Sequence, residues 1–450
     1  MSMKIILFGT GEIFRKYKMQ IKFKYVTEIV DNSEDKHNEE CCGYRIKYPS
    51  EVSYKDCDYV IIMTDSFEMM KEQLLGDGVS GEKIKSYKDI GDIFQLDITM
   101  HIGNKKFNCT EWDNEGKKIF IMSHSGKRTG VPIALMNHAL LLRELGWNVV
   151  YGILDSGTIC EELNEKNIPY IDNIALNENS KKFHDFLRDF NIILIGTLVL
   201  TEFEKKINGL KISTVWWIHE SQEKMYEKYK LPDEDDHIKY YGVGDRVFRM
   251  FHLFYPDKEI GSMIYYLPDQ YKLQKNKSDS FTFSFIGSDR KLKGVDILVQ
   301  AVKSLEENIR NQIKVIMVCP DAEVDDYNMI KEIPQISMVG EKKQEEILDI
   351  YSQTDVLVCP SRDDPMPIVV TQAMQYKIPC IVSNQVGQHI YLRDNKGGFV
   401  FENENYRQLA RIMELCVLKG DLREEGKKAR EVYDRFFSKQ YVMGKIKTIF

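Results

Sequence analysis

The chain has 450 residues, enough for two or three domains. Hydrophobic residues make up 43% of it, which is ordinary for a soluble globular protein, and the net charge of −7 argues against a protein that binds nucleic acid over its whole surface. The longest apolar run, residues 192–200, has the length of a strand and falls short of the ~18 residues that a membrane span needs.

Cysteine usage and the N-terminal segment indicate the compartment. The nine cysteines are an odd number without framework spacing, which favours buried free thiols in a reducing compartment over disulfides or a metal site. Residues 1–9 resemble a short signal peptide, but a Gly-x-Gly turn and a charged helix follow at once, so we interpret them as a first strand. We therefore expect a cytoplasmic protein, with a possible location at the inner face of the membrane considered below.

Residues 1–95 predict a small Rossmann-like α/β domain. A strand at 4–8 is followed by the turn Gly9-Thr-Gly11, and a second strand ends at Asp31, where such folds contact a ribose. Phe14 stands where the third glycine of the fingerprint would be, so nucleotide binding by Gly9, Gly11 and Asp31 and simple turn chemistry are equally open. A dehydrogenase is a third hypothesis, for which the sequence offers neither a catalytic base nor a substrate domain.

Residues 96–116 are polar and irregular, and we interpret them as a linker with room for one hairpin. A second α/β domain, 117–270, begins with a strand at 118–122, a glycine-containing loop that ends at Gly130, and an amphipathic helix at 131–145. Another strand, 213–218, ends at His219, which places that side chain at the crevice of a parallel sheet. Taken alone, such a histidine is more often a core or surface residue.

The segment 246–255 is rich in basic and aromatic residues. This composition is compatible with contact to a membrane or to a lipid-linked acceptor. Its apolar residues also recur at helical spacing, which favours packing onto the sheet. We keep peripheral membrane contact as the lesser of the two interpretations.

A Lys/Asn/Ser-rich stretch at 272–280 marks a hinge before a third α/β domain, 278–437. This domain opens with a strand at 281–286, then Gly287, a basic loop that contains Arg290, and Lys293-Gly294 before a helix at 295–307. We expect a last helix at 438–450.

Residues 354–383 are the most informative stretch. An apolar strand at 356–358 is followed by a polar loop and then by a helix that runs to about residue 376. Asp364 precedes this helix and Gln372 lies two turns into it. The free amides near Met366, Pro367, Ile368 and Val369 would face a diphosphate at the helix N-terminus, although Pro367 itself has no amide hydrogen.

This stretch resembles the large retaining GT-B glycosyltransferase family 4, whose signature reads Pro-Ser-x-x-Glu, seven residues, then Glu-Ala-Met. Here Pro360-Ser361-Arg362-Asp363-Asp364 is followed, after seven residues, by Gln372-Ala373-Met374. Both family glutamates are therefore replaced, and Ser288 stands where the family has an arginine. The resemblance covers residues 117–450 and implies two Rossmann-like domains that face a cleft, preceded here by the small third domain.

The resemblance implies a site and a reaction. Lys293, the helix amides and a second cation, either Arg290 or Lys291, would bind the donor diphosphate. Gly130 would allow close backbone approach to the distal phosphate or to the acceptor, and Gly287 would lie against the donor. The last helix, 438–450, would cross back to the second α/β domain. Asp364 would bind sugar hydroxyls, His219 would line the sugar pocket, and Gln372 would bind the ribose. His219, Lys293 and Asp364 are thus the catalytic candidates. We see no metal-binding motif and expect no required cofactor.

The expected activity is transfer of a sugar from a nucleotide diphosphate sugar to a glycan or lipid-linked acceptor, as in the synthesis of cell-surface polysaccharides. An alternative follows from the altered signature. The chain would then be a degenerate GT-B protein that binds a nucleotide sugar without turnover and assists an active transferase.

Overall fold

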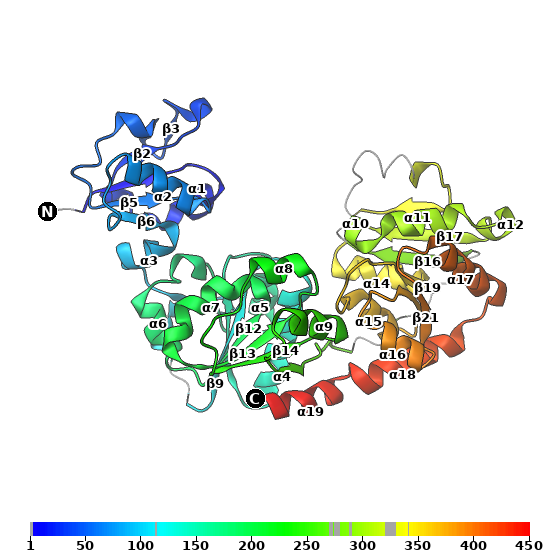
Figure 1. Ribbon diagram of the computed structural model, residues 1–450. Helices are drawn as coiled ribbons and strands as arrows, with labels where there is room; N and C mark the ends of the chain where they lie inside the picture. Colours follow the sequence, from blue (N-terminus) through cyan, green and yellow to red (C-terminus); the bar gives the residue numbers. More distant parts are fainter. Residues whose placement is uncertain are drawn as a thin grey trace.

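The computed structural model describes residues 3–450 except 113–114, 270–272, 274–279, 288–289, 320–329 and 341, and the side chains of residues 110, 290, 344 and 345. Within this part the chain forms three α/β units, each built on its own sheet (Figure 1). Most of the hinge expected at 272–280 lies outside the described residues.

The N-terminal unit has a six-stranded sheet in the order β3-β4-β2-β1-β5-β6. All neighbouring pairs are parallel except β3 with β4. Its elements are β1 (Ile5–Phe8), α1 (Glu12–Tyr17), β2 (Val26–Val30), β3 (Glu40–Cys41), β4 (Tyr44–Lys47), β5 (Tyr59–Ile62), α2 (Phe67–Gly76), β6 (Ile84–Ser86) and α3 (Ile90–Ile93).

The second unit, which we call the first lobe, carries a nine-stranded sheet in the order β15-β14-β13-β12-β9-β10-β11-β7-β8. The strands are β7 (Thr99–Ile102), β8 (Lys105–Asn108), β9 (Lys118–Ser123), β10 (Asn148–Ile153), β11 (Tyr170–Ile171), β12 (Ile192–Gly196), β13 (Ser213–Ile218), β14 (Ile238–Gly242) and β15 (Ile260–Ser262). The helices are α4 (Gly130–Glu144), α5 (Ile159–Glu165), α6 (Lys181–Leu187), α7 (Thr201–Ile207), α8 (Glu223–Lys228) and α9 (Asp245–Phe254).

The stretch expected to be a linker carries the hairpin β7–β8, and β7 pairs antiparallel with β11. This hairpin extends the sheet of the first lobe, because its backbone groups find partners along the edge strand β11.

The third unit, the second lobe, has a fully parallel sheet in the order β18-β17-β16-β19-β20-β21. Its strands are β16 (Phe281–Ile286), β17 (Ile313–Val318), β18 (Ile336–Met338), β19 (Val356–Cys359), β20 (Cys380–Ser383) and β21 (Gly398–Phe401). Its helices are α10 (Arg290–Lys293), α11 (Val295–Lys303), α12 (Glu307–Arg310), α14 (Gln344–Gln353), α15 (Ile368–Gln375), α16 (His389–Asp394), α17 (Tyr406–Lys419) and α18 (Arg423–Phe436).

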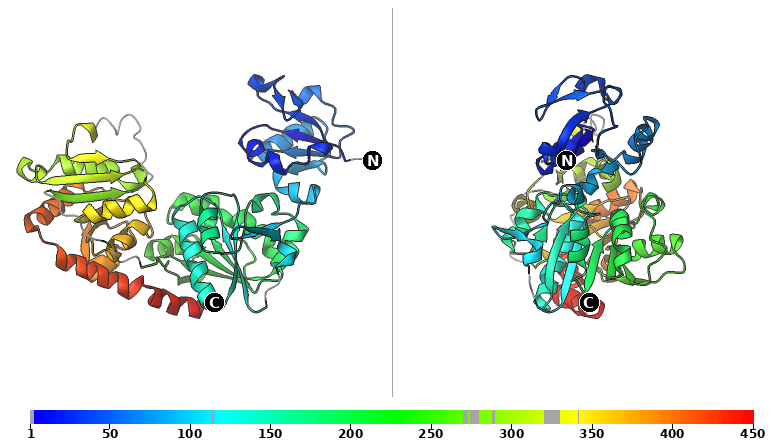
Figure 2. Two further views of the ribbon diagram at one scale, coloured as in Figure 1. Left: turned by 180° about the vertical axis from the view of Figure 1, so that it is seen from behind. Right: turned by 90° about the vertical axis from the view of Figure 1, so that its left-hand side faces the viewer.

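The last helix, α19 (Lys439–Ile449), returns to the first lobe. Lys439 Nζ lies 2.6 Å from a carboxylate oxygen of Glu144, and the ring of Phe450 meets that of Trp147 edge to face at 6.5 Å. From both sides α18 and α19 are seen to run beneath the two lobes, while the N-terminal unit stands on the far end of the first lobe (Figures 1 and 2).

Local sequence explains the strands of the second lobe. β19 is a four-residue apolar run and β20 has three apolar residues before Ser383, and all of these side chains are buried, as expected for strands covered by helices on both faces. Pro367 is the N-cap of α15, and its ψ of 126° is extended, so the helix begins at the next residue. The carboxyl ends of the parallel strands and the start of α15 therefore meet at one edge, where ligands bind in open α/β sheets.

Candidate donor site between the lobes

Lys293 and Asp364 form the centre of the candidate site. Lys293 ends α10, Asp364 lies in the loop after β19, and the ammonium group is ion-paired with Asp364 Oδ2. The Gly287 backbone lies beneath the Lys293 stem, since a Cβ on Gly287 would come within 3.1 Å of Lys293 Cγ. Gly294, with a φ of +73°, then turns the chain into α11.

The pKa values of both residues are raised above their usual values. Burial raises the pKa of the Asp364 carboxyl, and the Lys293 ammonium opposes that rise without cancelling it. Burial lowers the pKa of Lys293, but the Asp364 charge outweighs this effect, so that its pKa is raised. Lys293 is therefore a firmly held positive charge beside the N-terminus of α15.

Arg362 holds the loop that carries Asp364. Its guanidinium donates to both Asp296 carboxylate oxygens at 2.7 Å and to both oxygens of Glu404 at 2.5 and 2.9 Å. Its backbone N–H donates to Leu292 O at 2.8 Å. Arg362 thus joins this loop to α10 and α11, and its donors are used within the protein.

Of the remaining donor candidates, Gln372 has a protein partner. The Tyr351 hydroxyl lies 3.2 Å from Gln372 Oε1 and 3.1 Å from Val369 O. The Gln372 amide nitrogen remains available to a ligand hydroxyl, and Oε1 retains a second lone pair. Arg290 begins α10, but its side chain and Ser288 lie outside the described part of the chain.

The first lobe supplies Gly130 and His219 on the other side. A Cβ on Gly130 would lie 3.9 Å from Ile368 Cδ1, so the glycine loop directly faces the start of α15. His219 follows β13, and Nε2 of its ring is shielded from solvent and has no hydrogen-bond partner among the described residues. Burial, together with His138 and His124, lowers the pKa of His219 to about 3.

A polar contact that the sequence analysis missed joins the lobes beside this site. Arg246, in the first turn of α9, donates from Nε to Asp363 Oδ1 at 3.0 Å and from an Nη to the same oxygen at 2.5 Å. Ser221 Oγ donates to that oxygen at 2.6 Å. The sequence did contain one indication of this contact. Ser221 and Arg246 are polar residues that follow the carboxyl ends of the neighbouring strands β13 and β14.

α9 also bears on the membrane interpretation of residues 246–255. Val247 and Phe251 are buried in the first lobe, which supports packing of this helix onto the sheet. Leu253, by contrast, is 67% exposed. None of the helices within the described ranges is long and apolar enough to cross a membrane.

The weak nucleotide candidates of the N-terminal unit are engaged internally. Asp31 accepts hydrogen bonds from the Thr10 amide and hydroxyl at 2.7 and 2.6 Å and from the Ser33 amide at 2.9 Å, and it pairs with Lys36. Burial opposes ionisation, but these donors outweigh it and hold the pKa of Asp31 below its usual value. Gly9 has a φ of +103°, and Gly11 precedes α1. These contacts support the turn-chemistry interpretation, and nucleotide binding there stays a prediction.

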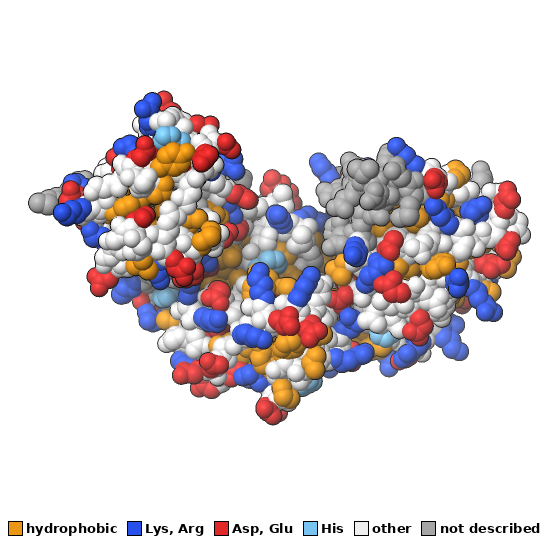
Figure 3. All heavy atoms as spheres, turned by 45° about the horizontal axis from the view of Figure 1, so that its top comes forward, with side chains coloured by type: hydrophobic (Ala, Val, Ile, Leu, Met, Phe, Trp, Pro, Cys, Tyr) orange, Lys and Arg blue, Asp and Glu red, His pale blue; other side chains and the backbone are white. Residues whose placement is uncertain are grey.

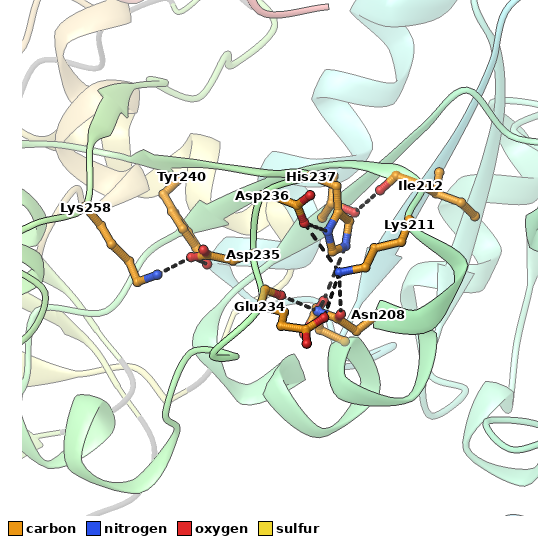
Figure 4. Close-up of polar contacts among 11 residues, drawn as sticks. Asn208, Lys211, Ile212, Glu234, Asp235, Asp236, His237, Tyr240 and Lys258 are labelled. Atoms are coloured by element: carbon orange, nitrogen blue, oxygen red, sulfur yellow. Dashed lines mark hydrogen bonds and ion pairs between the residues drawn. The ribbon is translucent and has the colours of Figure 1, made fainter.

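A second polar cluster lies elsewhere on the first lobe, ahead of β14 (Figure 4). There Lys211 lies 3.2 Å from Glu234 and 3.4 Å from Asp236, while Asp235 accepts from the Tyr240 hydroxyl at 2.7 Å. Surface hollows flank this cluster. They contain none of the candidate residues, so we place the site in the cleft. Over the described residues no group of three or more His, Cys, Asp or Glu side chains is arranged to hold a metal ion.

Comparison with known families agrees with this geometry. Residues 269–432 match the model for glycosyl transferases group 1, residues 115–241 match glycosyl-transferase family 4, and residues 1–85 match a C2185-like N-terminal domain. Residues 115–241 and 269–432 therefore belong to the family 4 and group 1 glycosyltransferases, and the two lobes have the GT-B fold. The resemblance predicted from 117–450 is thereby confirmed.

Solved structures show the same fold in other glycosyltransferases. Anabaena HepE, in a complex with UDP-glucose, is 14% identical and superposes with a TM-score of 0.62 over 74% of this chain and 99% of that one. A sucrose-phosphate synthase from Thermosynechococcus elongatus, also 14% identical, gives 0.59 over 74% and 98%.

Curated relatives match over shorter segments. A capsular polysaccharide biosynthesis glycosyltransferase of Staphylococcus aureus is 22% identical over 40% of this chain and 48% of its own length. An α-1,3-galactosyltransferase of Escherichia coli, named as acting from UDP-Gal on a GlcNAc-diphosphoundecaprenol, is 29% identical over 28% and 34%. The chain thus spans about half or less of the length of these curated relatives.

Proposed function

We propose that this glycosyltransferase moves a sugar from a nucleotide diphosphate sugar to a glycan or lipid-linked acceptor in polysaccharide or glycoconjugate synthesis, with retention of anomeric configuration and without a metal ion. The observation that carries the proposal is the Lys293–Asp364 pair at the N-terminus of α15, opposite Gly130 of the other lobe. Cation and anion there match the two ends of such a donor, a diphosphate and a polyhydroxylated sugar.

Each residue has a defined part in this proposal. Lys293 and the amides at the start of α15 stabilise the charge that develops on the departing diphosphate. Asp364 accepts hydrogen bonds from donor sugar hydroxyls, and the neutral His219 ring offers Nε2 to the sugar from the first lobe. Gln372 contacts the ribose through its amide. The leaving phosphate helps to deprotonate the acceptor hydroxyl, which is consistent with retention.

The second candidate, a binding protein without turnover, has its own support. Ser288 replaces the family arginine, and Gln372 replaces a charged glutamate and already accepts a hydrogen bond from Tyr351, so one of the family's donor contacts is lost and another is weakened. Such a protein would still bind the donor, because Lys293 and the amides at the start of α15 are still present to contact the diphosphate. Donor turnover separates the two candidates.

The test is a thermal-stability screen against UDP-, GDP-, ADP- and dTDP-sugars, followed by assays for nucleotide release and for transfer. We expect one base to raise the Tm, and we expect Lys293→Ala to abolish that rise. Lys303→Ala is the matched control, since Lys303 lies on the neighbouring α11 and pairs with Glu332 at the surface.

Released nucleotide in the wild type establishes the enzyme, and stabilisation without release, even with acceptors present, favours the binding protein. A panel that leaves the Tm unchanged would refute both. Proton NMR of the product tests retention through its anomeric coupling, and activity after dialysis against EDTA tests metal independence.

A further inference from the structure

The loops that carry the two halves of the candidate site are joined across the cleft by one cluster of side chains. Ser221 lies two residues after His219, and Asp363 immediately precedes Asp364. Asp363 Oδ1 accepts from Ser221 Oγ and from two guanidinium nitrogens of Arg246, while the third Arg246 nitrogen donates to Gln385 Oε1. Arg246 and Ser221 belong to the first lobe, and Asp363 and Gln385 to the second.

The burial of this cluster distinguishes it from an ordinary surface pair. The Arg246 and Asp363 side chains are only 18% and 12% exposed. At such sites a guanidinium that meets its acceptors through several nitrogens fixes both distance and angle, which a lysine cannot do. The cluster therefore holds the two lobes in one register.

The backbone around the cluster is packed equally closely. Gly244, the N-cap of α9, lies against the second lobe, since a Cβ there would come within 3.1 Å of Met366 Cε. Gly387 has no room for a Cβ, which would lie 1.6 Å from Pro365 O. The start of α9 is thus seated on the loop that leads from Asp363 to α15, and Arg246 is its polar anchor.

We propose that Arg246 is a positioning residue for the reaction: through Asp363 it sets His219 of the first lobe against Asp364 and the donor held by the second. The inference rests on the proposed function and adds to it. The donor anchors Lys293 and α15 belong to the second lobe alone, so loss of Arg246 leaves donor binding nearly intact. Catalysis is impaired instead, because His219 of the first lobe is no longer held in a fixed position relative to Asp364 and the donor in the second lobe.

The experiment is a double-mutant cycle with Arg246→Ala, Asp363→Ala and the double variant. We expect each single change to lower kcat about 10- to 100-fold, the effect of a displacement of about 1 Å, while the donor KM changes by less than about threefold. The double variant should be no slower than either single one, because both changes remove the same contact. Arg246→Lys, which keeps the charge but not the fork, should be intermediate.

Arg249→Ala is the matched control, since Arg249 lies on the same helix but pairs with Asp245 within it, at the surface. Hydrogen exchange supplies a readout that needs no donor. Faster exchange of residues 219–222 and 361–366 together, in Arg246→Ala and Arg246→Lys but not in Arg249→Ala, supports the proposal.

Three results would overturn it. Full activity of Asp363→Ala beside an impaired Arg246→Ala would show that Arg246 contacts the donor directly. Multiplicative losses in the double variant would show two independent roles, and unchanged exchange on both sides of the cleft would show that the cluster does not hold the lobes. A wild type that turns over no nucleotide sugar refutes the enzyme activity, and the exchange arm still decides whether Arg246 joins the lobes.

Discussion

The Trp217 ring lies between two histidines, with ring centroids 4.3 Å from His138 and 4.4 Å from His219. Burial lowers the pKa of His138 to about 4 and, with the neighbouring histidines, that of His219 to about 3. Both rings are therefore neutral at neutral pH. A neutral ring at His219 can hydrogen-bond a sugar hydroxyl without attracting the diphosphate away from Lys293.

This arrangement predicts acid sensitivity of the fold. In the unfolded chain His138 binds a proton near pH 6.5, whereas in the folded chain it stays neutral down to about pH 4. The unfolded state binds more protons in this window, so the free energy of unfolding decreases as the pH is lowered, by about 2 kcal/mol from pH 7.5 to pH 5 for His138 alone. Urea unfolding at the two pH values should show that His138→Gln loses about this much less than the wild type.

His252, an exposed histidine on α9, provides the control. His252→Gln should keep the acid-dependent loss of the wild type. Equal losses in the wild type and in His138→Gln would contradict a ring that is held neutral by burial.

At the scale of single elements, the strand, loop and helix of residues 354–383 were predictable from local signals. Apolar runs mark β19 and β20, and prolines mark the ends of the helical stretch. The β7–β8 hairpin was foreseen only as an optional feature, because its pairing with β11 depends on a strand about 70 residues away. Propensity reports such long-range pairing poorly.

The turn between α10 and α11 carries the prediction at this scale. Gly294 has a φ of +73°, and a Cβ there would lie 2.2 Å from Pro360 O, so the turn that presents Lys293 is pressed against the end of β19. Gly294→Ala should lose about 1 kcal/mol to backbone strain and about 1–3 kcal/mol more to overpacking. Its donor-induced Tm rise should shrink as well.

Gly420→Ala separates the two effects, because Gly420 has a φ of +68° while its nearest neighbour atom is 4.0 Å away. Chemical denaturation of both variants provides the measurement. If the free energy of unfolding falls by the same amount in both variants, close packing at Gly294 does not contribute to stability.

At the scale of the whole molecule, the N-terminal unit and the first lobe share a core. Ala175 and Leu176 of the first lobe are 3% and 2% exposed and lie in the same apolar cluster as strands β1 and β2. The Tyr17 hydroxyl of the N-terminal unit donates a hydrogen bond to the Asp155 carboxylate, and Lys16 forms an ion pair with it. The backbone carbonyl of Asp155 in turn accepts a hydrogen bond from the Gly126 amide of the glycine loop.

The space-filling view shows a hollow between the N-terminal unit and the second lobe, above the first lobe (Figure 3).

Leu176→Ala in the full chain should therefore destabilise the N-terminal unit, by about 2–4 kcal/mol for a buried leucine. Limited proteolysis should cleave residues 1–95 sooner, while donor-induced stabilisation of the lobes persists. Leu253→Ala, which truncates a 67% exposed side chain, should be cleaved like the wild type. An unchanged digestion pattern in Leu176→Ala would show that the shared core does not hold the unit.

Contacts between units mark the limit of prediction from sequence. The family signature singled out Lys293 and Asp364, because each lies at a strand-loop-helix junction that is visible in the local sequence, and the structure brings the two into an ion pair. Arg246 and Asp363 are 117 residues apart, and nothing near either residue identifies its partner. Their contact depends on how two separately folded sheets face each other, which no periodicity encodes.

The return of α19 to the first lobe also determines when that lobe can be completed during translation. Val442 and Ile446 lie in the apolar cluster that spans both lobes, and the ring of Phe450 meets that of Trp147 in the first lobe. The first lobe is thus discontinuous in the chain, with the whole second lobe inserted into it. The face around Glu144 and Trp147 therefore stays uncovered until α19 has been synthesised, so chaperones can bind it while the second lobe is being made.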